Sequence, residues 1–212
     1  MKLKKKYLRR SSNDRLYGID VPLVGLTGGI ASGKSTVGRL LMSHGLAVIN
    51  ADHLVKDVYS LPETFKFVKE TYPEVVKNGE IVFPLLRERV FSDAKVKAQI
   101  EALIYHKLPL AFLTALSKLG QPDVVIYDVP LLFEKNLENL FDLTALVYAP
   151  RKIQRDRLMI RDGHHEQMAE TILNQQLDIE EKRLRADVII SNKASETELT
   201  EEVNQFLRQT FE

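Results

Sequence analysis

The feature that most constrains the fold is a glycine-rich loop between an apolar run and an amphipathic segment. Residues 28–35 follow the pattern Gly-x-x-x-x-Gly-Lys-Ser, which is typical of loops that bind nucleotide phosphates. Residues 23–26 before it are an apolar run that predicts a buried parallel strand. Val37, Leu40 and Leu41 after it recur at helical spacing. A strand, loop and helix in this order predict an α/β fold with a nucleoside triphosphate bound at the loop.

Each residue type in the loop has a chemical task. Glycine permits the tight turn that points successive backbone N–H groups at phosphate oxygens. The side chain of Lys34 is long enough to reach the outer phosphates, and the hydroxyl of Ser35 is a suitable ligand for Mg²⁺. We therefore expect a nucleoside triphosphate and Mg²⁺ as the ligands.

Four further short strands are predicted along the chain, at residues 46–50, 123–127, 141–148 and 186–190. Helical segments separate them, which favours a parallel sheet with helices on both faces. The predicted core comprises residues 21–59, 121–150 and 186–212, and its last helix begins with the capping box Ser195-x-x-Glu198.

Residues 60–120 are predicted to be almost wholly helical, with turns at Pro73 and Asn78-Gly79. This is more helix than a crossover between two strands needs, so we expect an inserted substrate-binding subdomain. Arg87 and Arg89 lie on one of its helices. They either clamp an anionic substrate or form the polar face of an amphipathic helix, and the pattern alone leaves both interpretations open.

Two aspartates follow predicted strands, at the edge where parallel α/β sheets bind their ligands. Asp52 comes after the strand at 46–50 and is either a catalytic carboxylate or the N-cap of a helix over 53–59. Asp128 comes after the strand at 123–127, in a pattern that holds Mg²⁺ through water. That assignment requires its strand to lie beside the strand that precedes the loop.

A basic helix is predicted over residues 150–162, within a segment 151–185 that leaves the sheet. Its cations are Arg151, Lys152, Arg155, Arg157 and Arg161. A basic helix after a strand in such a protein favours a closing lid that supplies positive charge to the transition state. A solvated helix face is the alternative interpretation.

Composition limits the class of protein. A hydrophobic content of 44% over 212 residues supports one large domain, or a core with small insertions. Residues 1–20 carry seven Lys or Arg and two Asp, whereas the remainder carries 23 Lys or Arg and 27 Asp or Glu. We expect residues 1–20 to be a solvated, partly disordered extension, and we expect no nucleic-acid partner for the mildly acidic body. The chain has no cysteine and no apolar run of about 20 residues, which favours a cytoplasmic protein without a membrane partner.

Several stretches, in this order along the chain, resemble the dephospho-coenzyme A kinase family. They are LTGGIASGKSTV (26–37), VINAD (48–52), LRERVFSD (86–93), DVPLLFE (128–134), Arg157-x-x-x-Arg161, Gln176 and ADVIISN (186–192). The loop is shared by many kinases. The combination of Asp52, PLLFE and the spacing from Gln176 to Asp187 is more specific to the dephospho-coenzyme A kinase family.

The resemblance implies an adenylate-kinase-like core with a five-stranded parallel sheet, a CoA-binding helical insertion at 60–120 and a lid at 151–185. It implies phosphorylation of the ribose 3′-hydroxyl of dephospho-CoA by ATP with Mg²⁺, the last step of CoA synthesis. The implied ATP site is Gly29, Ala31, Ser32, Gly33, Lys34, Ser35 and Thr36. Asp52 is the implied general base, and Lys34 is the second implied catalytic residue. Ser35 and Asp128 are the implied ligands of the metal ion. The implied contacts with the substrates come from Arg87, Arg157 and Arg161.

Three departures from the family pattern fall around the acceptor. Asn50-Ala51-Asp52 stands where the family has Asp-Ala-Asp, Val82-Phe83 stands for Asp-Arg, and Tyr105-His106 stands for His-Pro. Two rival functions therefore stay open. One is a kinase for another small acceptor, such as a nucleoside or nucleotide, and the other is a nucleotide-binding protein without catalysis.

Overall fold

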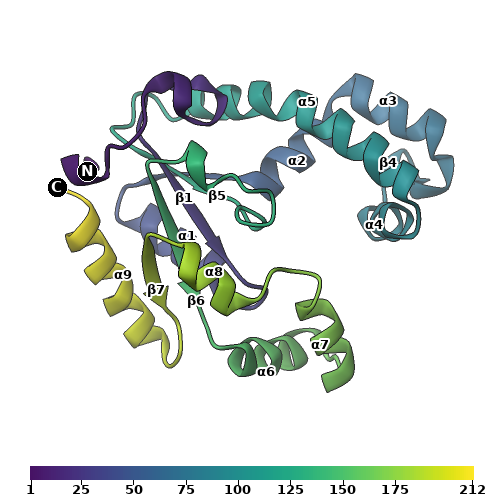
Figure 1. Ribbon diagram of the computed structural model, residues 1–212. Coiled ribbons are helices and arrows are strands. Elements are labelled where there is room, and N and C mark those ends of the chain that lie inside the picture. Colours follow the sequence, from purple (N-terminus) through teal and green to yellow (C-terminus); the bar gives the residue numbers. More distant parts are fainter. The chain divides into compact units, whose positions relative to one another are not determined.

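The computed structural model describes residues 1–212 and contains a parallel sheet of five strands (Figure 1). The strands are β1 (Leu23–Gly28), β2 (Ala47–Asn50), β5 (Val125–Asp128), β6 (Leu143–Tyr148) and β7 (Val188–Ser191). They pair in the order β2-β5-β1-β6-β7, and every pairing is parallel. The predicted α/β fold with five parallel strands is therefore confirmed.

The strand that precedes the loop occupies the centre of the sheet. All six residues of β1 are buried, as expected for a parallel strand covered on both faces. β5 lies beside β1, and Leu26 pairs with Asp128. The strand of Asp128 is therefore the immediate neighbour of the loop strand, as a metal-binding role for Asp128 requires.

The chain divides into two compact units, residues 1–50 with 119–212 and residues 51–118. The first unit holds the sheet and its helices. Those helices are α1 (Lys34–Ser43), α6 (Arg151–Asp162), α7 (Glu166–Leu173), α8 (Ile179–Arg185) and α9 (Glu196–Thr210), with short 3₁₀ turns at η1 (Lys5–Tyr7), η2 (Ser12–Asp14), η3 (Leu16–Gly18) and η5 (Glu138–Leu140). Side chains of α1 and α9 pack with those of β1, β6 and β7 in one buried cluster. The Ser195 hydroxyl accepts the Glu198 N–H at 3.2 Å, so the predicted cap of α9 is confirmed.

The second unit, residues 51–118, is mostly helical. It comprises α2 (Ala51–Ser60), α3 (Pro62–Thr71), η4 (Pro73–Val75), β3 (Val76–Lys77), β4 (Glu80–Ile81), α4 (Phe83–Ser92) and α5 (Ala94–Lys118). It begins at Ala51, whereas the sequence predicted an insertion beginning at residue 60. The antiparallel β3–β4 hairpin was not predicted, although its turn residues Asn78 and Gly79 have the positive φ values, 52° and 80°, that tight hairpins demand.

Residues 1–20 pack against the core instead of forming the solvated, partly disordered extension that we expected. Leu3 is buried in the main cluster and bridges to Phe211, at the end of the chain. The N–H of Lys2 donates to the carbonyl of Glu212 at 2.8 Å, and the N–H of Lys4 to that of Thr210 at 3.0 Å. The positive charge of this segment led to the wrong expectation, because its apolar residues, its backbone and its arginines Arg9 and Arg15 all contact the core.

A buried ion pair fastens the same segment beside the loop strand. Arg15 Nε donates to Asp142 Oδ2 at 2.7 Å, and both side chains are buried. Asp142 also accepts the N–H of Leu23, the first residue of β1, at 2.9 Å. Because the buried carboxylate is paired with a cation and further hydrogen-bonded, its desolvation is compensated. The N-terminal segment therefore helps to position the strand that carries the phosphate loop.

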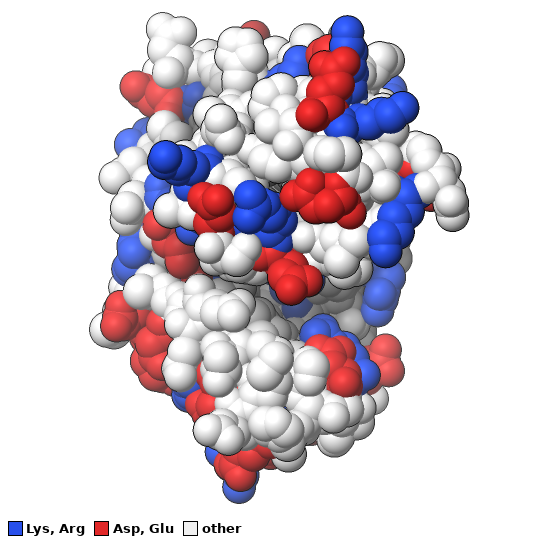
Figure 2. Space-filling view, turned by 90° about the vertical axis from the view of Figure 1, so that its right-hand side faces the viewer, with Lys and Arg blue, Asp and Glu red and all other residues white.

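The charges on the molecular surface are mixed. On the face drawn in Figure 2, basic and acidic side chains lie next to one another instead of gathering by sign. This face therefore offers no extended basic surface of the kind that tracks a phosphate backbone. None of the helices is long and apolar enough to span a bilayer.

Candidate active site

The loop between β1 and α1 has an unusual backbone conformation. The N–H of Ser32 donates to the carbonyl of Gly29 at 3.1 Å and closes a tight turn. Within that turn Ala31 has a φ of 58°, and Gly33 just after it has a φ of 91°. Glycine adopts such values freely, whereas alanine is strained there by about 1–2 kcal/mol. The loop therefore depends on surrounding contacts to hold Ala31 in place.

Two glycines of the loop lie directly against side chains. A Cβ at Gly29 would overlap Gln154 Oε1, and a Cβ at Gly33 would overlap Asn192 Nδ2. Close approach therefore favours glycine at both positions, and the positive φ favours it further at Gly33. The helix begins at Lys34, so the free N–H groups of its first turn face the space above the sheet edge, where an anion is stabilised.

The charged centre of the site forms at the carboxyl ends of two strands. The ammonium of Lys34 pairs with Asp128 Oδ1, and Asn50 Nδ2 donates to Asp128 Oδ2 at 2.7 Å. Asp128 is 2% exposed, so its charge is balanced mainly by Lys34. Asn50 is one of the departures from the family pattern. In the structure, Asn50 supplies a hydrogen bond where an aspartate would place a second carboxylate.

The donors at this centre fit Mg²⁺. Ser35 supplies a hydroxyl and Asp128 a carboxylate, and Mg²⁺ prefers such oxygen ligands. No group of three or more His, Cys, Asp or Glu side chains is arranged to hold a metal ion.

The two lid arginines that the family pattern singles out lie in different surroundings. Arg157 donates to Asn192 Oδ1 at 3.1 Å and to the carbonyl of Ala31 at 3.5 Å, so it lies beside the loop. Arg161 is exposed and donates to the adjacent Asp162 at 2.7 and 2.8 Å, which lowers the pKa of that carboxyl. The structure therefore brings Arg157 to the loop, whereas Arg161 contacts only its neighbour.

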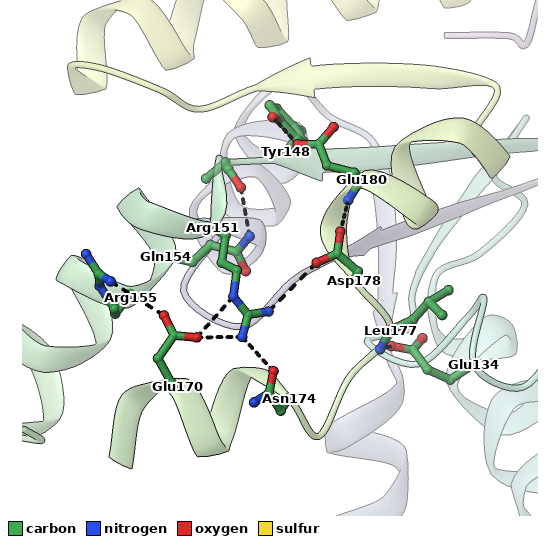
Figure 3. Close-up of polar contacts among 11 residues, drawn as sticks. Glu134, Tyr148, Arg151, Gln154, Arg155, Glu170, Asn174, Leu177, Asp178 and Glu180 are labelled. Carbon is green, nitrogen blue, oxygen red and sulfur yellow. Dashed lines mark hydrogen bonds and ion pairs between the residues drawn. The ribbon is translucent and has the colours of Figure 1, made fainter. Parts of the chain in front are cut away.

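Two other basic residues of the segment 151–185 pair with carboxylates of the same segment. Figure 3 shows Arg151 between Glu170, Asn174 and Asp178, which it reaches at 2.6, 2.6 and 3.8 Å. Arg155 pairs with Glu170 at 3.6 Å from the other side. These contacts join α6 to α7 and to the start of α8. Arg151 and Arg155, which we expected to supply positive charge to the transition state, are thus paired with carboxylates of the segment 151–185.

Two glutamines to which the sequence assigned no role, Gln176 and Gln154, lie against the loop. Gln176 Oε1 accepts the N–H of Ile30 at 3.1 Å. The buried Gln154 donates to the carbonyl of Ala149 at 2.7 Å and places its oxygen against Gly29. The only sequence signal for Gln154 is a polar residue on the face of the helix that also carries the buried Leu158.

A buried lysine, Lys182, lies close enough to the charged centre to interact with Lys34. The Lys182 side chain is fully buried, and its ammonium is 2.6 Å from Glu134 Oε1. That oxygen also accepts the N–H of Leu177 at 3.1 Å. Burial lowers the pKa of Lys182, the Glu134 contact opposes this, and the positive charge of Lys34 lowers it further. The pair ties α8 to the loop that follows β5.

The remaining predicted site residues lie in the second unit. Asp52 is the second residue of α2, so it occupies the first turn and not the N-cap position that we considered as the alternative. Arg87 is exposed on α4.

Phe83 stands where the family pattern has an arginine. Its ring packs edge-on against Tyr59 with ring centroids 5.4 Å apart, and burial raises the pKa of Tyr59 to about 12.

Comparisons with known proteins agree on one family. A family model described as dephospho-CoA kinase matches residues 22–198. A curated dephospho-CoA kinase from Fusobacterium nucleatum is 33% identical over 190 residues, covering 89% of this chain and 98% of the relative. One from Anaeromyxobacter dehalogenans is 36% identical over 191 residues, covering 87% of this chain and 90% of the relative.

Solved structures give the same picture of the fold. The crystal structure of TT1252 from Thermus thermophilus superposes with a TM-score of 0.80 at 31% identity, covering 89% of this chain and 97% of that one. The structure of dephospho-CoA kinase from Campylobacter jejuni has a TM-score of 0.61 at 25% identity, covering 88% of this chain and 96% of that one.

Proposed function

The chain belongs to the dephospho-CoA kinase family, and on this premise we propose that it phosphorylates the ribose 3′-hydroxyl of dephospho-CoA with ATP. The product is coenzyme A, and the reaction is the last step of CoA synthesis. The observation that carries the proposal is the arrangement of the loop, Lys34 and Asp128 at the carboxyl edge of the sheet. This arrangement positions phosphates and supplies charge, which is most of what phosphoryl transfer requires.

The loop and the start of α1 bind the triphosphate in this proposal. The backbone N–H groups of Gly33, Lys34 and Ser35 donate to phosphate oxygens, and the helix N-terminus favours their charge. Lys34 exchanges its partner Asp128 for the outer phosphates and stabilises the charge that moves onto the leaving oxygen. Arg157, already beside the loop, is the lid cation we assign to ATP, and Arg161 approaches only when the lid closes.

Ser35 and Asp128 would hold Mg²⁺: release of Lys34 to the phosphates frees one Asp128 oxygen, while Asn50 still donates to the other. The ion would neutralise phosphate charge and orient the group to be transferred. The protein's own contribution here is the fixed position of the Asp128 carboxylate, which β5 places next to β1.

Asp52 serves as the general base for the acceptor. The ribose 3′-oxygen forms a bond to the γ-phosphorus, and the bond from that phosphorus to the β–γ bridging oxygen breaks, so that ADP leaves. The hydroxyl proton passes to the Asp52 carboxylate. Arg87, exposed on α4, contacts the phosphates of the acceptor.

A second candidate function is a kinase for another small acceptor. The observation that favours it is Phe83, which packs on Tyr59 at a position where the family pattern has an arginine.

The same departure predicts weaker binding of dephospho-CoA. Loss of one charge-assisted hydrogen bond costs about 1.5–3 kcal/mol, or roughly one to two decades in affinity. We therefore expect a raised KM for dephospho-CoA, with turnover retained.

An ADP-release assay across a panel of acceptors distinguishes these functions. With ATP and Mg²⁺, dephospho-CoA is expected to give a higher kcat/KM than adenosine, AMP or phosphopantetheine. ATP hydrolysis without an acceptor is the background control. A higher kcat/KM for AMP or adenosine would contradict the assignment, and ATP binding without transfer to any acceptor would favour a non-catalytic nucleotide-binding protein.

A further inference from the structure

The phosphate loop contains a strained residue at the position where its turn is closed. The N–H of Ser32 and the carbonyl of Gly29 close the turn at 3.1 Å, and Ala31 within it has a φ of 58°. An alanine disfavours this left-handed conformation and would relax if its neighbours were free. Something outside the turn must therefore hold it.

Two side chains from the lid segment hold the turn from either side. Gln176 Oε1 accepts the N–H of Ile30 at 3.1 Å, just before Ala31. Arg157 donates to the carbonyl of Ala31 itself, the residue with the strained φ angle, at 3.5 Å. The Gln176 contact is the shorter of the two. It also leaves the N–H groups of Gly33, Lys34 and Ser35 available for phosphate oxygens.

We infer that Gln176 is a positioning residue for the nucleotide. It keeps the Gly29–Ser32 turn in the left-handed form that presents the following N–H groups to the triphosphate. The inference rests on the proposed function, because it assumes that ATP binds at this loop. Gln176 itself touches the loop and not the reacting atoms, and it links nucleotide binding to the segment between α7 and α8.

The position of Gln176 also makes the inference testable without loss of the fold. Its side chain is only partly buried, and it lies in the linker between two helices. Replacing it by leucine removes the acceptor for the Ile30 N–H and leaves the core unchanged. The adjacent Gln175 is exposed and serves as a matched control.

The test is a double-mutant cycle read as the Kd for ATP with Mg²⁺, measured by calorimetry without acceptor. Gln176→Leu is expected to raise the Kd about tenfold, or about 1.4 kcal/mol. In the background of Ala31→Gly, where glycine accepts the left-handed conformation without strain, the same change is expected to cost less than about threefold. Gln175→Leu is expected to bind as the wild type does.

Each other outcome contradicts the inference. Equal Kd values for the wild type and Gln176→Leu would show that the contact does not position the loop. An equal loss in the wild-type and Ala31→Gly backgrounds, or a lowered melting temperature with unchanged Kd, would indicate a purely structural role. A wild-type chain without affinity for ATP would contradict the proposed function itself, and the inference with it.

Discussion

Replacing Lys34 by alanine is expected to lower kcat by about 10³-fold or more, because charge stabilisation of the transferred phosphoryl group dominates this class of catalysis. The side chain pairs with Asp128 at the carboxyl edge of the sheet and is 12% exposed. It is the cation that the proposed function assigns to the outer phosphates. Steady-state ADP release with saturating ATP and dephospho-CoA measures the effect.

Two controls separate this effect from damage to the fold. Lys34→Ala leaves the buried Asp128 with the Asn50 hydrogen bond as its remaining compensation, so some loss of stability is expected. Assays well below the melting temperature of the variant remove that contribution. Lys152 is an exposed lid lysine, and Lys152→Ala is expected to keep the wild-type rate. A Lys34→Ala enzyme with near-normal kcat would contradict the mechanism.

The second large effect is expected for Asp52→Asn, which retains the shape of the side chain and removes the base. If Asp52 accepts the proton of the ribose hydroxyl, kcat falls by about 10²–10⁴-fold while the Kd for ATP changes little. Asp52 is exposed in the first turn of α2, so loss of its charge costs the helix only about 0.3–1 kcal/mol. Kinetics and ATP calorimetry on the same preparation separate the two quantities.

A matched control for Asp52 is available on the same helix. Asp57 is also exposed on α2, and Asp57→Asn is expected to leave kcat unchanged. An Asp52→Asn enzyme that turns over within a few-fold of the wild type would assign the residue to the helix and not to catalysis.

Much of the fold could be predicted because its signals are local. Apolar runs marked the strands, and the glycine pattern with a following amphipathic segment marked the loop and α1. Strand order is not local, so the sequence alone left open whether Asp128 lies beside the loop strand. The N-terminal segment was mispredicted because its seven Lys and Arg suggested a solvated segment, whereas its spaced apolar residues Leu3, Leu16 and Ile19 are buried.

The candidate site was predictable where backbone chemistry dictates the residue type. Gly33, Lys34 and Ser35 follow from the needs of phosphate binding. The contacts of Gln176 and Asn192 join the loop to residues far along the chain, and a lone amide in a sequence carries no sign of such a partner. Lys182 is likewise buried only through tertiary packing, since a lysine in a charged helix suggests a solvated position.

The central claim is tested most directly by identifying the product formed from dephospho-CoA, ATP and Mg²⁺ by the purified chain. Mass spectrometry and phosphorus NMR are expected to show a single added phosphoryl group on the ribose 3′-oxygen, with an equal amount of ADP formed. Dephospho-CoA recovered unchanged, or phosphorylated at any other oxygen, would contradict the account.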